Sequence, residues 1–394
     1  MPSVQAVQSN FARNGSKPAE NRKPRICMPT WRKFTTKAFR CGLYEAQDVL
    51  VETDSVDVIG PEPGWRFQLI ENLQRTLLYH DVTRKLAFLN PGLGKVRLAQ
   101  EYELFVGVCQ NWWDLLYLNA IEGWEQHCRT SVCWLDEVWA ASLPDYKYLF
   151  RALERFDHIF VGTSGSVGPL SRAIGKSCRW LPGAVDALRF TPSPNALPRV
   201  IDVYSIGRRW DGIHRTLLRA AERGEIFYIY DTFEAANSET TDPREHRELF
   251  ANIAKRSRYF VVAPPKMDTP DHTHGQVEIG YRYFEGAAAG TVMIGQAPRC
   301  AAFGEMFPWP DAVVEVQPDG SDVSSVLASM RSEPERHSAI GRRNATEALL
   351  RHDWIYRWKE VFSVAGIEPS EYMAARQRRL KDLAEQRPDK VNAT

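Results

Sequence analysis

Short apolar runs alternate with longer amphipathic segments along most of this chain. The apolar runs read as strands at residues 24–29, 55–60, 103–109, 130–135, 158–162, 177–182, 200–207, 226–231, 259–264, 291–295 and 312–316. Helical patterns fit between them at residues 66–88, 145–156, 211–223, 243–257, 277–289, 321–331 and 334–350. This alternation is typical of βαβ units wound around a parallel sheet, so it predicts an α/β protein.

The stretch TPSPNALPR at residues 191–199 interrupts the pattern, because its three prolines break any regular element. A chain of 394 residues also exceeds one ordinary core. We therefore predict two Rossmann-like domains, at residues 23–190 and 191–350, that face each other across a cleft. Ligands of open α/β sheets bind at the carboxyl ends of the strands, which makes this cleft the expected site. Residues 1–22 and 376–394 lack apolar periodicity and read as flexible tails.

Residues 351–375 follow the second domain and contain the sequence RHDWIYRWKEVFS. Within it Trp354, Trp358 and Phe362 recur at a four-residue spacing, which places the three rings on one helix face. We expect this helix to cross back and pack that face onto the first domain.

The composition argues against several classes of protein, namely nucleic-acid-binding, membrane-spanning and secreted proteins. Hydrophobic residues make up 44% of the chain, and the formal net charge is +1, which argues against a nucleic-acid partner held by overall positive potential. No run approaches the roughly 18 apolar residues of a membrane span. The polar N-terminus does not read as a secretory signal. The seven cysteines form no CxxC pair, so reduced thiols and a cytoplasmic location are expected.

Basic residues gather near the start of the chain: Lys23, Arg25, Arg32, Lys33, Lys37 and Arg40. They would suit an anionic surface or a lipid-linked acceptor, which would place the protein at the periphery of a membrane. Scattered, solvated charges on the protein surface are the alternative explanation.

The stretch RYFEGAAAGTVMIG at residues 282–295 places one acidic residue, Glu285, before a run of small residues and an apolar strand. A carboxylate against close-packed backbone is costly to bury unless a partner satisfies it, so the stretch is a candidate binding site. The small residues let the helix lie close to the sheet, where a ligand reaches the backbone. A Glu stabilised by the helix dipole is the simpler alternative.

Several stretches together resemble the GT-B glycosyltransferases, and most closely the bacterial branch of CgeB-type proteins and group 1 glycosyltransferases. They are GQVEIGYRYFEGAAAGTVMIG (275–295), VYSIGRRWDGIHRTLLRAA (203–221) and RHDWIYRWKEVF (351–362). In the first half, residues 157–192 resemble the usual end of a GT-B first domain. The resemblance covers residues 200–362 well and implies a nucleotide-sugar donor.

By this resemblance, Glu285 accepts hydrogen bonds from the two ribose hydroxyls of the donor, and a carboxylate does offer acceptors to such a diol. Arg282 stands before it, as in the CgeB-like branch, and is expected to help hold the donor phosphates. Related retaining enzymes carry another Glu eight positions before Glu285, near the transferred sugar. Val277 stands there instead, and the nearest carboxylate is Glu278. Glu278 either takes this catalytic role through a local shift or is a surface residue of the helix.

The donor diphosphate needs positive charge or free backbone N–H groups, and a glycine turn before a helix supplies the second. The turn HTHGQ lies just before the Glu285 helix. It suggests that the backbone around Gly275 and Gln276 binds phosphate and that His274 adds a side-chain donor, although His274 is as well explained as a loop residue without a role.

A second candidate for phosphate binding is SIGRRWDGIHR, in which Gly207 is followed by Arg208 and Arg209. Guanidinium groups suit the geometry of phosphate. Arg215 is a substitute candidate, or it forms a salt bridge on the face of a helix. The sequence leaves open which of the three arginines binds.

The first domain is expected to hold the acceptor. Asp136 and Glu137 follow the strand TSVCWL at its cleft-facing end, where a carboxylate can take the proton of an attacking hydroxyl. Capping of a helix explains Asp136 equally well, and Asp114 is a weaker candidate. We also expect at least one ring of a tryptophan cluster to face the cleft: Trp112, Trp113, Trp124, Trp134 or Trp139.

These observations favour a GT-B glycosyltransferase that moves a sugar from a nucleotide-diphosphate donor to an unidentified acceptor. No DxD pair or His/Cys cluster has metal-ligand spacing, so we expect neither a metal ion nor a cofactor. Arg side chains and helix dipoles would stabilise the leaving diphosphate. A nucleotide-sugar 2-epimerase and a non-catalytic nucleotide-sugar-binding protein are the alternatives. A nicotinamide-dependent dehydrogenase is disfavoured, because PTWRKF rather than GxGxxG follows the first strand.

Overall fold

The computed structural model describes residues 23–78, 88–193, 197–232 and 238–387, which contain two larger parallel sheets. The first has the order β2-β1-β4-β6-β7-β8, with β1 Ile26–Pro29, β2 Val56–Ile59, β4 Tyr102–Cys109, β6 Cys128–Leu135, β7 His158–Val161 and β8 Cys178–Trp180. The second has the order β10-β9-β11-β12-β13, with β9 Ile201–Ser205, β10 Tyr228–Tyr230, β11 Ser257–Val262, β12 Val292–Gly295 and β13 Val314–Glu315. Each predicted strand is present. The tail expected at residues 1–22 lies outside the described residues.

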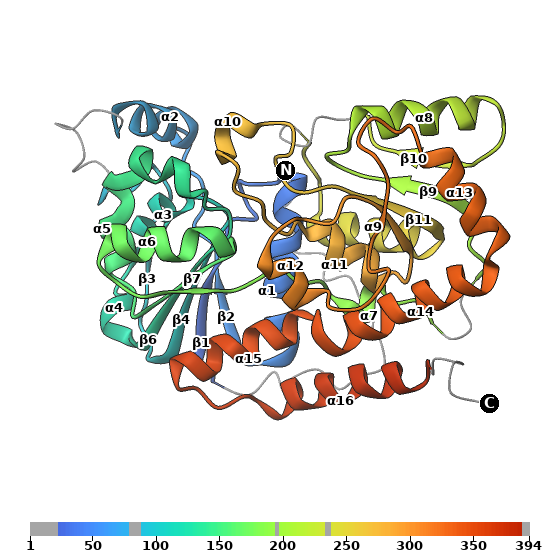
Figure 1. The fold of residues 1–394 in the computed structure, drawn as a ribbon. Helices are drawn as coiled ribbons and strands as arrows, with labels where there is room; N and C mark the ends of the chain where they lie inside the picture. Colours follow the sequence, from blue (N-terminus) through green and yellow to red (C-terminus); the bar gives the residue numbers. More distant parts are fainter. Residues whose placement is uncertain (1–22, 79–87, 194–196, 233–237, 388–394) are drawn as a thin grey trace, which may run out of the picture.

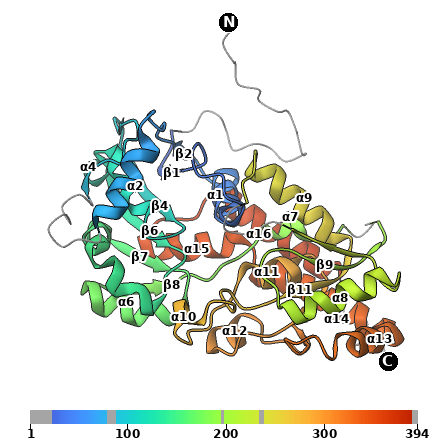
Figure 2. The same cartoon turned by 90° about the horizontal axis from the view of Figure 1, so that it is seen from above.

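Helices alternate with these strands, and Figures 1 and 2 show the two α/β units side by side. Those up to the end of the first sheet are α1 Cys41–Thr53, α2 Phe67–Leu78, α3 Asp114–Tyr117, α4 Trp124–His127, α5 Phe150–Glu154 and α6 Val167–Ile174. Those beyond it are α7 Ala187–Phe190, α8 Asp211–Glu222, α9 Pro243–Lys255, α10 Pro270–Thr273, α11 Tyr281–Ala288, α12 Ala301–Met306, α13 Val323–Ser332, α14 Pro334–Arg351, α15 Trp354–Ala365 and α16 Glu371–Glu385. Short 3₁₀ helices include η1 Ala38–Arg40, η4 Ala140–Leu149 and η5 Ser164–Ser166. The predicted pair of Rossmann-like units is confirmed.

Helix α1 has no counterpart among the helices predicted from the sequence. Almost every one of its residues is buried, and it packs against α9 of the second domain as well as against α15 and α16. Polar residues such as Glu45, Gln47 and Asp48 are buried in this helix together with the apolar ones, so the sequence carries only a weak amphipathic pattern. Its position between the domains becomes important for the site.

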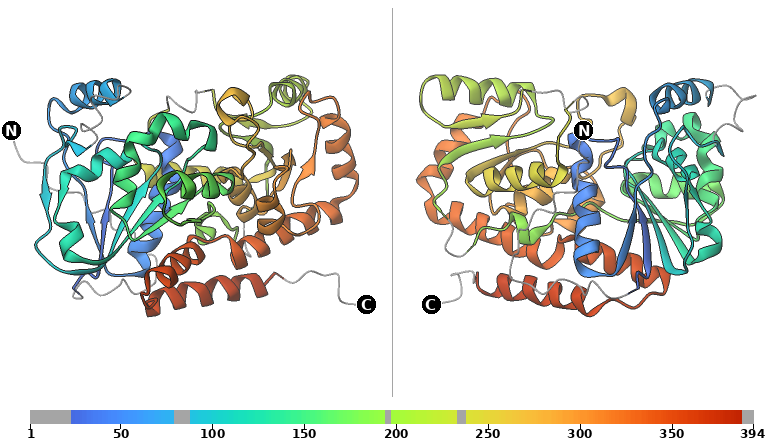
Figure 3. Two further views of the ribbon diagram at one scale, coloured as in Figure 1. Left: turned by 60° about the vertical axis from the view of Figure 1, so that its left-hand side comes forward. Right: turned by 180° about the vertical axis from the view of Figure 1, so that it is seen from behind.

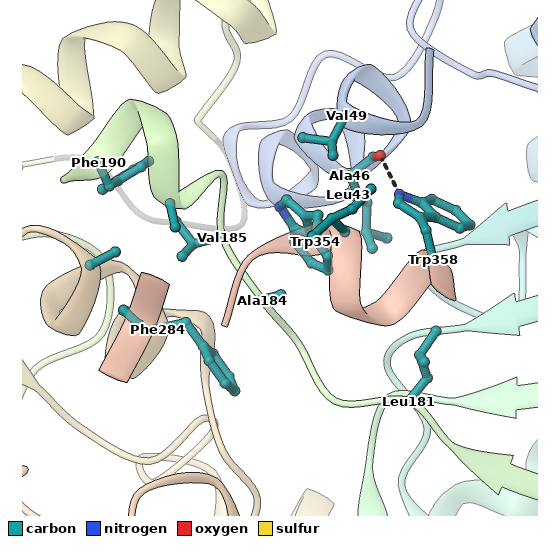
Figure 4. Packing of buried hydrophobic residues seen from close by; sticks show 14 of the residues in the cluster. Leu43, Ala46, Val49, Leu181, Ala184, Val185, Phe190, Phe284, Trp354 and Trp358 are labelled. Atoms are coloured by element: carbon teal, nitrogen blue, oxygen red, sulfur yellow. Dashed lines mark hydrogen bonds between the residues drawn. The ribbon is translucent and has the colours of Figure 1, made fainter. Parts of the chain in front are cut away.

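Helix α15 carries the three aromatic residues predicted to pack onto the first domain. Trp354, Trp358 and Phe362 are all buried. The Trp358 indole N–H donates to the carbonyl oxygen of Ala46 in α1 at 2.8 Å, as Figure 4 shows. The Trp134 ring of the first domain lies 5.6 Å from that of Trp354 and 6.0 Å from that of Trp358. The predicted crossing helix is therefore confirmed.

Helix α16 corrects the expectation of a flexible tail at residues 376–394. Met373, Leu380 and Ala384 of this helix are buried in the same core as α14 and α15, and Figure 3 shows α16 running along both domains. The expectation is wrong for residues 376–385, since a stripe of apolar residues among many charges is enough to bury one helix face. Residues 388–394 lie outside the described part of the chain.

Helix α11 begins at Tyr281 rather than at residue 277, and it lies very close to its sheet. A Cβ atom added to Gly286 would meet the Phe260 ring at 2.8 Å and the Met293 sulfur at 2.9 Å. Ala287 and Ala288 are fully buried as well. The prediction that small residues bring this helix against the sheet is confirmed.

Candidate active site

A cavity of about 340 Å³ lies between the two domains. The first domain lines it with residues that follow its strands, namely Gln110 after β4, Asp136 after β6 and Thr163 after β7. The second domain contributes Arg208 after β9 and Lys266 after β11. The walls are thus the carboxyl ends of both sheets, where α/β proteins bind ligands. The volume falls in the range of small-molecule sites.

Asp136 is the carboxylate in this cavity that is best placed for acid–base chemistry. Its Oδ1 accepts a hydrogen bond from the Tyr281 hydroxyl at 2.7 Å, and its Oδ2 accepts one from Gln110 Nε2 at 2.9 Å. Burial raises the pKa of Asp136 to about 7, although hydrogen bonding by Tyr281 works in the opposite direction. A carboxylate that titrates near neutral pH suits a general base. It does not cap η4, whose N-cap residue is Trp139.

Asp114, the weaker candidate, has a structural role. Its carboxylate is fully buried and accepts two hydrogen bonds of 2.7 Å from the Arg40 guanidinium. The backbone N–H of Gln110 donates to it at 2.7 Å. Because buried partners already satisfy both oxygens, Asp114 positions the loop that carries Gln110 instead of facing a ligand.

The structure separates the three arginines that the sequence left as alternatives. Arg208 lines the cavity, and its guanidinium forms a salt bridge with Asp268 at 3.0 Å. Arg209 turns away and binds both the side chain and the carbonyl oxygen of Asp231. Arg215 pairs with Asp211 one turn away on the exposed face of α8. Arg208 is therefore the arginine of the three that is available to a ligand in the cavity.

Gly207 shapes the turn that presents Arg208. It has a φ of +78°, which glycine adopts at little cost, and its backbone N–H donates to Asp231 Oδ2 at 2.9 Å. This N–H group is therefore already paired with a carboxylate inside the protein.

Glu278 lines the cavity but uses its carboxylate to join the two domains. Its oxygens accept hydrogen bonds of 2.8 Å from the backbone N–H groups of Ser164 and Gly165, at the start of η5 in the first domain. The Ser164 hydroxyl and the Gln276 amide donate to it as well. Only 3% of Glu278 is exposed, so the alternative of a surface residue is wrong. All four donors belong to the protein itself, so these contacts do not test whether Glu278 also meets a sugar. Its catalytic role stays a prediction.

The turn at residues 274–276 lies apart from the cavity lining. His274 and Gly275 are exposed and have φ values of +47° and +83°. Helix α11 begins only at Tyr281, so these residues are not at its N-terminus. Gln276 makes contacts between the domains, accepting a hydrogen bond from the Ala140 N–H at 2.9 Å and donating one to the Ser166 hydroxyl at 2.9 Å. The phosphate-binding role of this turn therefore has no support from the geometry.

Glu285 is buried, with 1% of its surface exposed, and arginines pair with both of its oxygens. Arg247 of α9 binds Oε1, and Arg282 binds Oε2 from one turn earlier in α11. Burial opposes ionisation of Glu285, but the two guanidinium groups outweigh it and lower its pKa. The sequence argument required a partner for this carboxylate, and the partners in the structure are two arginines rather than a ligand. The ribose-binding role itself stays a prediction.

Glu45 of α1 is a buried member of this cluster that the sequence analysis missed. Arg247 donates to it twice, at 2.7 and 3.0 Å, while Arg189 lies 3.2 Å away. The backbone N–H of Asp186 and the indole N–H of Trp354 also donate to Glu45. It therefore connects the Glu285 cluster of the second domain to the first.

A sequence signal for this cluster exists in α9. Arg247 shares its helix face with Phe250, Ala251 and Ala254, all of which are buried. A buried cation such as Arg247, on an apolar helix face, needs a buried anion as its partner. The sequence pattern of α9 therefore predicts an ion pair, but it does not identify which acidic residue forms it.

Comparisons with known proteins decide the fold. Residues 199–363 match a family model described as glycosyl transferase-like. An alpha-glucosyltransferase solved with UDP and a 13-mer DNA containing an HMU base aligns over 87% of this chain and 99% of its own, with a TM-score of 0.51 and 10% identity. The N-terminal domain of Candida albicans trehalose-6-phosphate phosphatase aligns over 89% and 98%, with a TM-score of 0.52 and 7% identity. This protein has the GT-B fold. A search of curated proteins found no match.

The GT-B fold explains why one half of the cavity comes from each domain. The family match covers the second domain and α15, while the CgeB-type branch stays a prediction. The expected exclusion of nucleic acid also stays a prediction, since the aligned alpha-glucosyltransferase was solved with DNA.

Within the part of this GT-B chain that the structure describes, no group of three or more His, Cys, Asp or Glu side chains is arranged to hold a metal ion. No helix among the described residues has the length and apolar character needed to cross a membrane. All seven cysteines are free thiols. The expectations of metal independence and of a cytoplasmic location stay predictions.

Two further expectations concern the first domain of the GT-B fold. Trp139 lines the cavity, whereas Trp112, Trp124 and Trp134 are buried in the cores.

The basic residues near the start of the chain mostly form ion pairs: Arg25 with Asp54, Arg32 with Asp48, Lys33 with Glu62, Lys37 with Glu239 and Arg40 with Asp114. Lys33 and Lys37 lie in solvent-exposed pairs, whereas Arg40 is buried, so the alternative of solvated surface charges is wrong for Arg40.

Proposed function

We propose that this protein transfers a glycosyl group from a nucleotide-diphosphate sugar to a hydroxyl group of an acceptor. The carrying observation is the interdomain cavity, which holds a carboxylate of near-neutral pKa, Asp136, opposite a cation, Arg208. The family match of the second domain supports glycosyl transfer, and the UDP in the aligned alpha-glucosyltransferase supports a nucleotide donor.

The proposed step needs one base and one cationic site. The acceptor oxygen forms a bond to the anomeric carbon, while the bond from that carbon to the diphosphate oxygen breaks. Asp136 accepts the proton of the hydroxyl, and Arg208 stabilises the negative charge that develops on the leaving nucleoside diphosphate. Tyr281 and Gln110 hold the Asp136 carboxylate in place through its two oxygens.

This proposal includes no metal ion. Cationic side chains supply the charge that a divalent ion would otherwise provide, so the chelator EDTA should leave the transfer rate unchanged. A rate that falls with EDTA and recovers with Mg²⁺ or Mn²⁺ would contradict this part.

The direct test measures release of nucleoside diphosphate from UDP-, GDP- and TDP-sugars, with and without a panel of sugar and lipid-linked acceptors. We expect one donor to be consumed by the wild type, and Asp136→Asn and Arg208→Met to reduce its consumption. Arg215→Met is the matched control, because its guanidinium lies on the exposed face of α8. Absence of binding of every nucleotide and nucleotide sugar in isothermal titration calorimetry would overturn the proposal.

A further inference from the structure

Lys266 is a second cation on the wall of the cavity, and its backbone is unusual. It has a φ of +55°, in the left-handed region that residues other than glycine seldom occupy. Such conformations are costly and cluster at functional sites, where the surrounding structure holds them in place. At Lys266 this conformation accompanies a side chain that lies on the cavity wall.

The Lys266 side chain reaches across the cavity to the first domain. Its Nζ lies 2.7 Å from Glu137 Oε1 and 5.5 Å from the centre of the Trp139 ring. Glu137 has another donor, since the Trp139 indole N–H lies 3.1 Å from the same oxygen. The carboxylate therefore keeps a partner when the lysine moves away.

Burial distinguishes this ion pair from the pair that Arg247 forms with Glu285. The side chains of Lys266 and Glu137 are 26% and 34% exposed, whereas those of Arg247 and Glu285 are 3% and 1% exposed. A partly exposed pair contributes little net stability, because water screens it and solvates both groups after separation. The Lys266–Glu137 pair can therefore exchange partners, and the Arg247–Glu285 pair cannot do so cheaply.

The sheet places Lys266 beside the proposed phosphate site. Strands β9 and β11 are neighbours, with Val203 paired to Tyr259, so the loops that carry Arg208 and Lys266 leave the same edge. Both side chains line the same cavity. A diphosphate between them would meet a guanidinium from one loop and an ammonium from the other.

We propose that Lys266 binds the donor diphosphate together with Arg208, and that Glu137 is the anion it leaves when the nucleotide enters. This inference rests on the proposed function and adds a specific exchange to it. A diphosphate carries more negative charge than one carboxylate, so it competes successfully for the ammonium group. The exchange also connects donor binding to the first domain, because it breaks a contact between the domains.

The test is isothermal titration calorimetry with UDP and with inorganic pyrophosphate. We expect Lys266→Met to weaken binding of both ligands by tenfold or more, and Lys266→Arg to retain most of the affinity. Glu137→Gln should tighten both by a few fold, because it removes the competing charge and keeps an oxygen for the Trp139 N–H. Lys33→Met is the matched control, since it removes a lysine from an exposed ion pair with Glu62 that does not line the cavity.

The sign of the Glu137→Gln effect decides between exchange and a purely structural contact. Weaker binding in Glu137→Gln, comparable to the loss in Lys266→Met, would show that the pair only holds the domains together and would overturn the inference. Binding by the wild type with no change in Lys266→Met would overturn it while leaving the proposed function intact. If the wild type binds none of UDP, GDP, TDP and pyrophosphate, both this inference and the proposed function fail. Thermal melts without ligand identify a variant that has not folded; if Lys266→Met is that variant, the sign of the Glu137→Gln effect carries the comparison.

Discussion

Arg247 binds Glu285 in its own domain and Glu45 in the other domain with one guanidinium group. The hydrogen bonds to Glu45 measure 2.7 and 3.0 Å, and at most 3% of any of the three residues is exposed. The two GT-B domains are therefore joined beside the cavity by buried charges as well as by apolar packing. Further ion pairs extend this cluster through Arg189 and Asp186 to Arg376 and Asp353.

Removal of Arg247 should destabilise the protein strongly. In Arg247→Met, two buried carboxylates lose their shared cation, and breaking a buried pair in this way typically costs about 3–5 kcal/mol. Urea unfolding followed by circular dichroism measures the loss as a shift of the midpoint. The control Arg215→Met, in an exposed i,i+4 pair, should change stability by less than about 0.5 kcal/mol. Equal midpoints for the two variants would show that the buried cluster does not stabilise the joint.

Glu285→Gln tests the ribose-binding hypothesis apart from the structural role. If the carboxylate binds the ribose diol, this variant should lose UDP affinity by about tenfold, because one to two hydrogen bonds to a charged group are weakened. Its affinity for pyrophosphate should stay unchanged. Pyrophosphate is the matched ligand, because it has the charge of the donor but no hydroxyl pair. An unchanged affinity for UDP would assign Glu285 to the structural cluster alone.

Asp136 should give the transfer rate a pH dependence centred near 7. Its pKa is raised to about 7, so the rate should rise as the pH increases through that value and the base loses its proton. Asp136→Asn should lower the rate by about 10²–10⁴-fold. Tyr281→Phe removes a donor that favours the ionised carboxylate, so the rising limb should move to higher pH. A limb that stays in place would mean that another group controls the profile.

The raised pKa of Asp136 also predicts how the free energy of unfolding depends on pH. The folded-state pKa of Asp136 lies above the unfolded value of 3.8, so the unfolded state releases this proton first as the pH rises. Between about pH 4 and 7 the native state therefore loses stability relative to a variant without the titration. Asp136→Asn should be more stable than the wild type at pH 8, with the difference shrinking toward pH 4. Thermal melts at several pH values measure this difference, and a wild type that is the more stable protein at pH 8 would contradict it.

Gly286 should tolerate no larger side chain. A Cβ atom at this position falls within 3.0 Å of Phe260 and Met293, and Gly286→Val should cost about 1–3 kcal/mol by overpacking. Gly304 in α12 is the control, because nothing lies within 4 Å of its Cβ position. Gly304→Ala should stabilise the protein by about 0.4–1 kcal/mol. Chemical denaturation compares the two, and a Gly286→Val variant as stable as the wild type would show that α11 can shift away from its sheet.

The order of strands and helices was readable from periodicity, because each strand of a parallel sheet is buried on both faces and leaves a short apolar run. The α15 stripe of Trp354, Trp358 and Phe362 was readable in the same way. Helix α1 was not, since its polar residues are buried in ion pairs among apolar ones and leave no clear division into an apolar and a polar face. The place of Asp136 in the cavity wall was readable from its position directly after β6, while its catalytic role stays a prediction.

The sequence by itself determined the two α/β units and placed the loops of Asp136 and Arg208 at the strand ends that line the cavity, because these follow from local periodicity and from the direction of parallel strands. Only the tertiary structure decided the partner of each charged side chain. Glu285 meets Arg247 and Arg282, Glu278 meets the start of η5, and Lys266 meets Glu137 across the cavity. Apart from the i,i+3 pair of Arg282 with Glu285, these contacts join residues far apart in the chain, and no local pattern encodes the few ångströms between them.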